Sequence, residues 1–113
     1  MLKIDMEKFK DVLIIRPEGK LVIGDEVGEF RKLLTDALEK GEKKIVIDLS
    51  KLSYMDSTGL GELVRSYTTV KKKGGELKLA NMTEKVKDLM FMTKLLTVFE
   101  NYDTVEEAVS SFE

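Results

Sequence analysis

Short apolar runs that alternate with amphipathic stretches are the feature that most limits how this chain can fold. Residues 43–50 ("KKIVIDLS") contain a continuous apolar run, which is typical of a strand covered on both faces. Residues 25–38 and 60–70 instead carry apolar side chains at helical spacing. Strands that alternate with such helices favour a largely parallel sheet. We therefore predict an α/β fold with a mixed, mostly parallel β-sheet and about four α-helices.

The N-terminal part of the chain predicts antiparallel strands. Apolar and polar residues alternate over 2–6, as in a half-buried strand. Residues 11–24 ("DVLIIRPEGKLVIG") form two β-rich runs joined by Pro17-Glu18-Gly19, which favours a hairpin with its turn at those three residues. Asp25 is then the predicted N-cap of a helix that Gly41 ends.

The C-terminal half continues the alternation. Residues 76–81 ("ELKLAN") predict a strand, and Thr83 predicts the start of a helix. Residues 95–102 ("LLTVFENY") can supply a brief last strand. Thr104 and Glu107 have the spacing of a capping box, which indicates a final helix.

Length and composition narrow the class of protein. With 113 residues and no linker or repeat, the chain is predicted to be a single domain over 1–113. A net charge of −2 gives no sign of attraction to nucleic acid, and no apolar run approaches the roughly 20 residues of a membrane helix. The absence of cysteine is compatible with a reducing compartment, so we expect a cytoplasmic protein without membrane insertion.

Two missing residue types exclude much of enzyme chemistry. The chain has no histidine and no cysteine, so neither a Ser-His-Asp nor a Cys-His site can form. It has no G-x-G-x-x-G or Walker loop, and its acidic residues lack the spacing of a calcium loop. We therefore expect no enzymatic activity, no metal site and no cofactor.

The segment 56–61 ("DSTGLG") breaks the local rules of helix formation. It follows the strand "IVIDL" and enters the helix of residues 60–70, at the edge where open α/β sheets usually hold their ligands. Asp56 or Ser57 can cap the first helical turn. Gly59 and Gly61 each cost about 1 kcal/mol relative to alanine in a helix, and they leave bare backbone there.

The residues alone leave two interpretations of this segment open. In the first, it is an ordinary cap whose small residues let the helix pack closely on the sheet. In the second, it is a functional surface on which a partner lies flush against the first turn, or on which a hydroxyl of Ser57 or Thr58 carries a phosphate. Broken local rules tend to coincide with function.

The segment "IVIDLSKLSYMDSTGLGELV" resembles the signature of the STAS family, the domain shared by sulphate transporters and bacterial anti-sigma factor antagonists. The resemblance extends to "PEGKL", "GGELKLAN" and "VKDLMFMTKLLTVF", and so covers essentially the whole chain. In the antagonists, the serine after the aspartate of the motif is phosphorylated by a serine kinase that is also the anti-sigma factor. The resemblance implies this role for Ser57. It implies a partner-binding surface made of Asp56, Ser57, Thr58, Gly59, Leu60 and Gly61.

The function implied by the resemblance is a binding switch. An unphosphorylated antagonist would bind the anti-sigma factor and free the sigma factor, and a cognate phosphatase would reverse the phosphorylation. Alternatives within the family are a non-catalytic subunit of a lipid-transport complex or of a stress-signalling assembly. A third alternative is a small module that binds an anion at the helix N-terminus.

Three places leave the prediction open. Family members often have an acid where this chain has Val22, and many have glycine where it has Lys94, so the turn after the third helix is uncertain. Residues 89–92 ("LMFM") are more apolar than one helix face can bury. We favour a helix end covered by the last strand, and the alternative is an exposed interaction surface.

Overall fold

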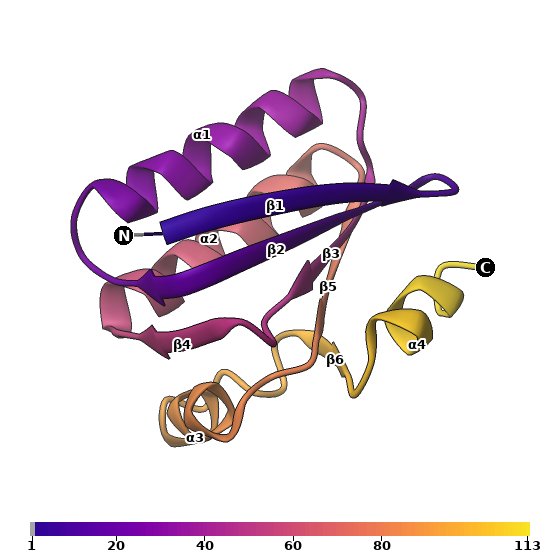
Figure 1. Ribbon diagram of the computed structural model, residues 1–113. Helices are drawn as coiled ribbons and strands as arrows, with labels where there is room; N and C mark the ends of the chain where they lie inside the picture. The colour runs from indigo at the N-terminus through magenta and orange to yellow at the C-terminus, as the bar shows by residue number, and fades with distance from the viewer. Residues whose placement is uncertain (1) are drawn as a thin grey trace.

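A computed structural model describes residues 2–113, which form one six-stranded mixed sheet and four α-helices (Figure 1). The strands are β1 (Leu2–Phe9), β2 (Val12–Leu21), β3 (Lys44–Asp48), β4 (Leu52–Met55), β5 (Glu76–Ala80) and β6 (Glu100–Tyr102). The helices are α1 (Asp25–Glu39), α2 (Ser57–Lys72), α3 (Glu84–Met92) and α4 (Val105–Ser110). The sheet order is β1-β2-β3-β5-β6, with β4 also paired to β2. The predicted α/β class is confirmed.

The antiparallel hairpin is present, but its predicted turn is wrong. β1 pairs with β2, and the chain reverses at Lys10-Asp11, where Lys10 has a φ of 56°. Pro17-Glu18-Gly19 lies inside β2. Val12–Ile15 pairs with β3, whereas Gly19–Leu21 pairs with β4. Proline has no N–H to donate to a ladder, so it suits the interval in which β2 changes its parallel partner.

The core lies on both sides of the central strands. Helices α1 and α2 cover one face of the sheet, and α4 lies on the other (Figure 1). Along β3, Ile45 and Ile47 join the larger cluster under α1 and α2, while Val46 joins the smaller cluster under α4. All three side chains are fully buried. The prediction of a strand covered on both faces is therefore confirmed.

The sequence suggested that the DSTGLG motif follows β3 directly, but the structure shows that it does not. The four-residue strand β4 intervenes, after a turn in which the Leu52 N–H donates to the Leu49 carbonyl at 3.1 Å. A strand of this length carries too little alternation to be recognised in the sequence. Because β4 pairs with the end of β2, the motif begins α2 beside Leu21 rather than at the end of the central strand.

Helix α1 begins one residue earlier than expected. Its N-cap is Gly24, which makes no side-chain cap hydrogen bond, and Asp25 lies in the first turn with Glu26. Gly24 has a φ of 135°, a conformation that is costly for other residues. Glycine therefore occupies the cap position because of this backbone conformation and not because of a side-chain hydrogen bond. The predicted caps of the later helices are confirmed: Thr83 and Thr104 each accept a backbone N–H of the first turn.

The end of α3 is not covered by the last strand, contrary to the favoured interpretation. Met90 is buried and Leu89 is partly buried, but Phe91 and Met92 are 71% and 78% exposed. β6 is only three residues long, too short to cover them. The exposed apolar surface that the sequence left as an alternative is therefore what the structure shows.

The turn after α3 adopts a glycine conformation without glycine. Lys94 has a φ of 63°, and its N–H donates to the Phe91 carbonyl at 3.1 Å. The Leu95 N–H reaches back to the Met90 carbonyl at 2.8 Å. This pair of bonds is a Schellman motif, whose left-handed position favours glycine. The departure from the family pattern at Lys94 thus keeps the turn and adds backbone strain.

Candidate functional site

The aspartate of the motif fixes the start of α2. Asp56 is the N-cap, and its Oδ1 accepts the Gly59 N–H at 2.8 Å. Its Oδ2 accepts the N–H of Ile23, in the loop before α1, at 2.9 Å. The bonds from Ile23 and Gly59 hold the pKa of Asp56 below its ordinary value, because they stabilise the charged form. One carboxylate therefore ties the helix to the β2–α1 loop.

The hydroxyl of Ser57 does not serve as the cap of α2. The sequence allowed either Asp56 or Ser57 as the cap, and the structure assigns it to Asp56. Ser57 is then the first residue of α2, and both it and Thr58 are exposed. Within the described residues 2–113, no hydrogen bond engages the Ser57 hydroxyl. It projects into solvent at the positive end of the helix dipole.

Gly59 is required by packing. A Cβ built at this position would lie 2.0 Å from the carbonyl oxygen of Leu21 and 3.0 Å from the side chain of Met55. The contact with Leu21 is with backbone, which cannot move aside without disturbing β2. Gly59 therefore lets the first turn of α2 press against the end of β2 and β4.

Gly61 has no such requirement. A Cβ built there would have no neighbouring atom within 4 Å, and the residue is exposed. Leu60, between the two glycines, is 3% exposed and belongs to the core. The six-residue motif thus divides into an inner part, which consists of Asp56, Gly59 and Leu60, and an outer part, which consists of Ser57, Thr58 and Gly61.

Exposed apolar side chains lie on the segments that flank the motif. Ile23, whose N–H is bound by Asp56, is 73% exposed. Tyr54, on β4, is 49% exposed and lines a groove of about 320 Å³ together with Leu89 and Met92 of α3. Figure 1 shows α3 below the end of β4, next to the point where α2 begins. Half-buried Val22 directly precedes Ile23.

A buried acid just after the motif escaped the sequence analysis. Glu62 is 2% exposed, and its Oε1 accepts the Nη2 of Arg31 on α1 at 2.7 Å. This contact raises the pKa of the Arg31 guanidinium, because the carboxylate favours its charged form. An acid among the residues of an amphipathic helix ordinarily indicates the solvent face, so only the packing of α1 on α2 identifies Glu62 as buried.

A second polar cluster lies away from the motif, at the carboxyl ends of β3 and β5. Asp48 is 3% exposed and accepts Arg16 Nε at 2.7 Å and Asn81 Nδ2 at 3.2 Å. Burial raises the pKa of Asp48, but the bonds from Arg16, Ser50 and Asn81 outweigh it and leave that pKa below its ordinary value. The cluster is a satisfied ion pair under the sheet edge.

The fold and the motif define a class: an α/β domain whose exposed helix N-terminus presents an unpartnered serine. The family model described as "STAS domain" matches residues 3–108, and the chain belongs to the STAS family. A curated relative from Paenibacillus polymyxa, the anti-sigma F factor antagonist, is 32% identical over 115 residues, covering 99% of this chain and 96% of that relative. The anti-sigma-B factor antagonist of Bacillus subtilis is 41% identical over 71 residues, covering 63% and 64%.

Solved structures show the same fold. The crystal structure of TM1081 from Thermotoga maritima is 31% identical, with a TM-score of 0.88 over 96% of this chain and 92% of that chain. The phosphorylated form of the Bacillus cell fate determinant SpoIIAA is 22% identical, with a TM-score of 0.76 over 98% of this chain and 100% of that chain. At that identity SpoIIAA supports the fold alone. No helix within residues 2–113 is both long and apolar enough to span a membrane.

Proposed function

We propose that this protein is an anti-sigma factor antagonist that binds its partner through the outer part of the motif and is switched off by phosphorylation of Ser57. The observation that carries the proposal is the assignment of the helix cap to Asp56, which leaves the Ser57 hydroxyl exposed and without a partner within residues 2–113. The names of the curated relatives support the same function.

The switch works through charge at a surface that the fold does not need. Phosphorylation adds about −1.5 to −2 charges at neutral pH. At an exposed site the helix dipole stabilises an added negative charge by only about 0.3 to 1 kcal/mol. The phosphate therefore changes the stability of the fold little, and the fold tolerates it. The neighbouring Asp56 carboxylate is already ionised, since its pKa is lowered. A partner that must desolvate both groups loses several kcal/mol of binding free energy.

The partner supplies the chemistry of modification. In the proposed cycle, the anti-sigma factor is a serine kinase, and the Ser57 Oγ attacks the γ-phosphorus of ATP. The bond to the β-phosphate oxygen breaks, ADP leaves, and the hydroxyl proton is released. A phosphatase later hydrolyses the phosphoserine with water and restores the hydroxyl. This chain contributes the exposed hydroxyl and its rigid position at the start of α2.

The apolar side chains around the motif supply binding area for the same partner. Ile23 and Met92 are 73% and 78% exposed and Tyr54 is 49% exposed, and Tyr54 and Met92 line one groove. Methionine and tyrosine are common in protein interfaces because they offer adaptable or rigid contact area. We propose that these side chains bind the anti-sigma factor, while Ser57 at their margin controls whether binding occurs.

Phosphopeptide mapping after incubation with the cognate kinase and ATP tests the proposal. We expect one phosphate, on Ser57, no modification of Ser57→Ala, and unchanged modification of the matched variant Thr58→Ala. Phosphate on Thr58, or none on the wild-type protein, would contradict the assignment. In the second case the family alternatives, a lipid-transport or stress-signalling subunit, would be favoured.

We also propose that the chain has no turnover of its own. The sequence lacks histidine, cysteine and a phosphate-binding loop. Purified protein incubated with ATP, GTP and ester substrates should release no product above the background. Turnover that persists in Asp56→Asn/Ser57→Ala would reveal a separate site, and turnover lost in that variant would make the motif catalytic.

A further inference from the structure

We propose that two copies of this chain associate through their β1 strands, in antiparallel register, to form one continuous sheet. β1 pairs with β2 over eight consecutive residues with no break in register, and it is the last strand on its side of the sheet. The strand at the opposite end, β6, has only three residues. Short edge strands are a common protection against pairing, and β1 lacks it. The inference is independent of the proposed function.

The charges of β1 select one register. In a two-fold antiparallel pair, the residues directly opposite each other lie on the same face of the sheet. If the axis passes at Ile4, Lys3 lies opposite Asp5 of the second copy, and this favourable pair occurs twice. An axis at Asp5 pairs Lys3 with Glu7 twice but also places Asp5 opposite itself, and an axis at Met6 places Asp5 opposite Glu7 twice, so the axis at Ile4 is the one of the three without a like-charge contact. Lysines often protect edge strands, but here Lys3 can pair with an acid, and the like-charge contacts of the other registers come from Asp5 and Glu7.

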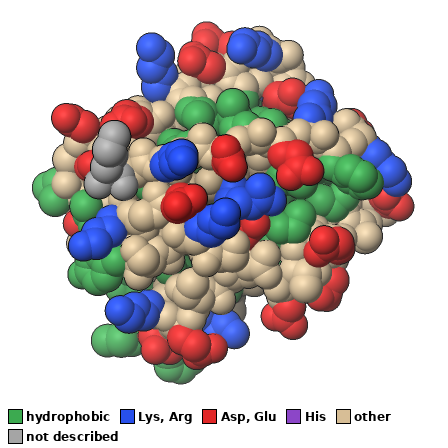
Figure 2. Space-filling view, in the orientation of Figure 1, with side chains coloured by type: hydrophobic (Ala, Val, Ile, Leu, Met, Phe, Trp, Pro, Cys, Tyr) green, Lys and Arg blue, Asp and Glu red, His purple; other side chains and the backbone are tan. Residues whose placement is uncertain are grey.

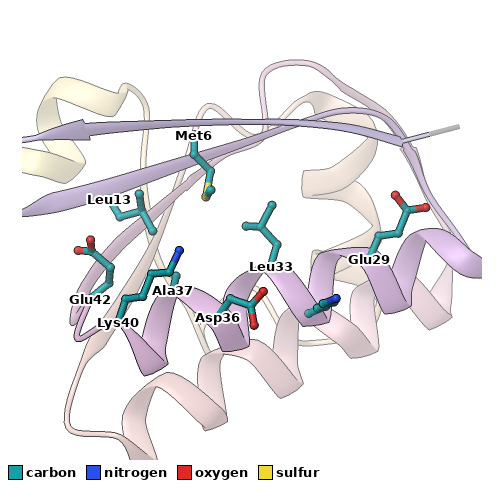
Figure 3. A pocket seen from close by; sticks show the side chains of 9 residues that line it. Met6, Leu13, Glu29, Leu33, Asp36, Ala37, Lys40 and Glu42 are labelled. Atoms are coloured by element: carbon teal, nitrogen blue, oxygen red, sulfur yellow. The ribbon is translucent and has the colours of Figure 1, made fainter.

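Helix α1 carries a second self-complementary charge pattern. A groove of about 520 Å³ separates β1 from α1, with Met6 and Leu33 facing it (Figure 3). Three charged residues of α1 and its C-cap residue line the same groove: Glu29, Lys32, Asp36 and Lys40. Two such helices placed antiparallel bring each acid opposite a base, Glu29 with Lys40 and Lys32 with Asp36. The first pair is centred between residues 34 and 35, and the second is centred at residue 34.

The charge pattern of β1 and that of α1 have centres that lie close together along the length of the strand and the helix. Lys8 of β1 forms an ion pair with Glu42, just beyond α1, at 3.0 Å. Ile4 lies four residues before Lys8, a distance of about 13 Å along a strand. Glu42 lies beyond the end of α1 at Glu39, and a similar distance back along the helix from that end is about nine residues, which reaches Phe30. The centres of the two patterns therefore lie within roughly one to two helical turns of each other along the molecule.

The pairing would also cover apolar side chains. Met6 is 51% exposed and points from β1 into the groove toward Leu33 (Figure 3). With the axis at Ile4, Met6 lies opposite Leu2 of the second copy, and Ile4 lies opposite itself. Figure 2 shows acidic and basic side chains interspersed on the face that carries β1, so no charge of a single sign opposes the approach of an identical copy.

Sedimentation of charge-swapped variants of the full chain tests the proposal. The wild-type protein should dimerise reversibly with concentration. Lys3→Glu and Asp5→Lys should each raise the dimer dissociation constant roughly tenfold or more, since each places like charges opposite one another twice. The double variant Lys3→Glu/Asp5→Lys should restore dimerisation. Lys51→Glu, an exposed position before β4, is the matched control and should behave like wild type.

A monomeric wild type at every concentration, or single variants that dimerise as well as wild type, would overturn the proposal. The register has its own test, because the chain has no cysteine. Ile4→Cys should form a disulfide-linked dimer under mild oxidation, since residues directly opposite have Cα atoms about 4.5 to 5.5 Å apart. Asp5→Cys, displaced by one position, should crosslink much less. The reverse order would overturn the register.

Discussion

The inner and outer parts of the DSTGLG motif lie together at the start of α2, but the fold requires only the residues of the inner part. On the inner part, Asp56 is bonded to two backbone N–H groups, and Gly59 lies where a Cβ would collide with the Leu21 carbonyl. On the outer part, Ser57 and Gly61 are exposed, and a Cβ on Gly61 would touch nothing. The first set of residues is explained by the fold, and the second set is not.

This difference separates two explanations that the sequence could not separate. A motif of small residues serves either close packing or access for a partner. Gly59 serves packing, because its substitution is sterically blocked. Gly61 weakens α2 with no return in packing, which is the pattern expected where function sets the residue. The following predictions test the division, from the largest expected effect to the smallest.

Gly59→Ala should be the most damaging single substitution in the motif. Its Cβ would require the end of β2 or the start of α2 to move, and overpacking of this kind costs typically about 1 to 3 kcal/mol. We expect a loss near 3 kcal/mol, because the blocking atom belongs to the backbone. Urea denaturation measures it. A variant as stable as wild type would break the division into inner and outer parts.

Asp56→Ala should cost about 2 kcal/mol of unfolding free energy. The upper end of the range for a lost N-cap applies because the same carboxylate also holds the Ile23 N–H. Asp56→Asn should lose less, since its Oδ1 can still accept the Gly59 N–H, although its amide nitrogen cannot accept the Ile23 N–H. Urea denaturation of both variants would contradict the assignment if Asn and Ala were equally destabilised.

Lys94→Gly should stabilise the protein by roughly 0.5 to 1 kcal/mol. Lys94 holds a left-handed conformation at the end of α3 that glycine adopts without a steric penalty. Lys94 is the converse of Gly61. At position 61 a glycine is present although the backbone conformation does not require one, whereas at position 94 the backbone adopts a conformation that favours glycine and the residue is lysine. Thermal melts of Lys94→Gly beside Lys94→Ala should show a gain for glycine alone.

Gly61→Ala should raise stability by up to about 1 kcal/mol, the helix-propensity difference, since its Cβ meets open space. It should also weaken binding to the anti-sigma factor, because the methyl group lies on the outer part of the motif. Thermal melts with calorimetric titration separate the two effects. A gain in stability with unchanged affinity would remove Gly61 from the binding surface.

Acid stability should depend on Asp56. Its folded pKa is lowered by the bonds from Ile23 and Gly59, so the charged carboxylate favours the native state. A lowered folded pKa gives stability that is present above the unfolded pKa near 3.9 and is lost as the pH falls through the folded value. The acid-unfolding limb of Asp56→Asn should therefore be shallower than that of wild type. Parallel curves would show that the carboxylate carries no such linkage.

Much of the fold could be predicted because the periodicities are strong. The buried run of β3 and the stripes of α1 and α2 follow directly from hydrophobic spacing. The errors lie where a local signal competes with pairing across the sheet. Pro17-Glu18-Gly19 has the composition of a turn, yet β2 continues through it because its partner changes from β3 to β4 there.

The sequence was enough to locate the site, but it could not show which residues of the motif belong to the inner part and which to the outer part. Position and composition indicated the motif, and capping rules left Asp56 and Ser57 as equal candidates. Only the structure shows that Asp56 is the cap: its Oδ1 accepts the Gly59 N–H, and its Oδ2 accepts the Ile23 N–H from a loop far away in sequence. Glu62 is a similar case, because its burial depends on Arg31 of another helix.

The most direct test of the account is a calorimetric titration of the anti-sigma factor with wild-type protein, Ser57→Ala and Ser57→Asp, paired with melts of each. Because Asp56 is the cap, both substitutions should leave stability within about 0.5 kcal/mol of wild type. Ser57→Ala should bind like wild type. Ser57→Asp should bind roughly 5- to 150-fold more weakly, since its carboxylate must be desolvated beside Asp56. A Ser57→Asp variant that binds as tightly as Ser57→Ala would contradict the charge switch.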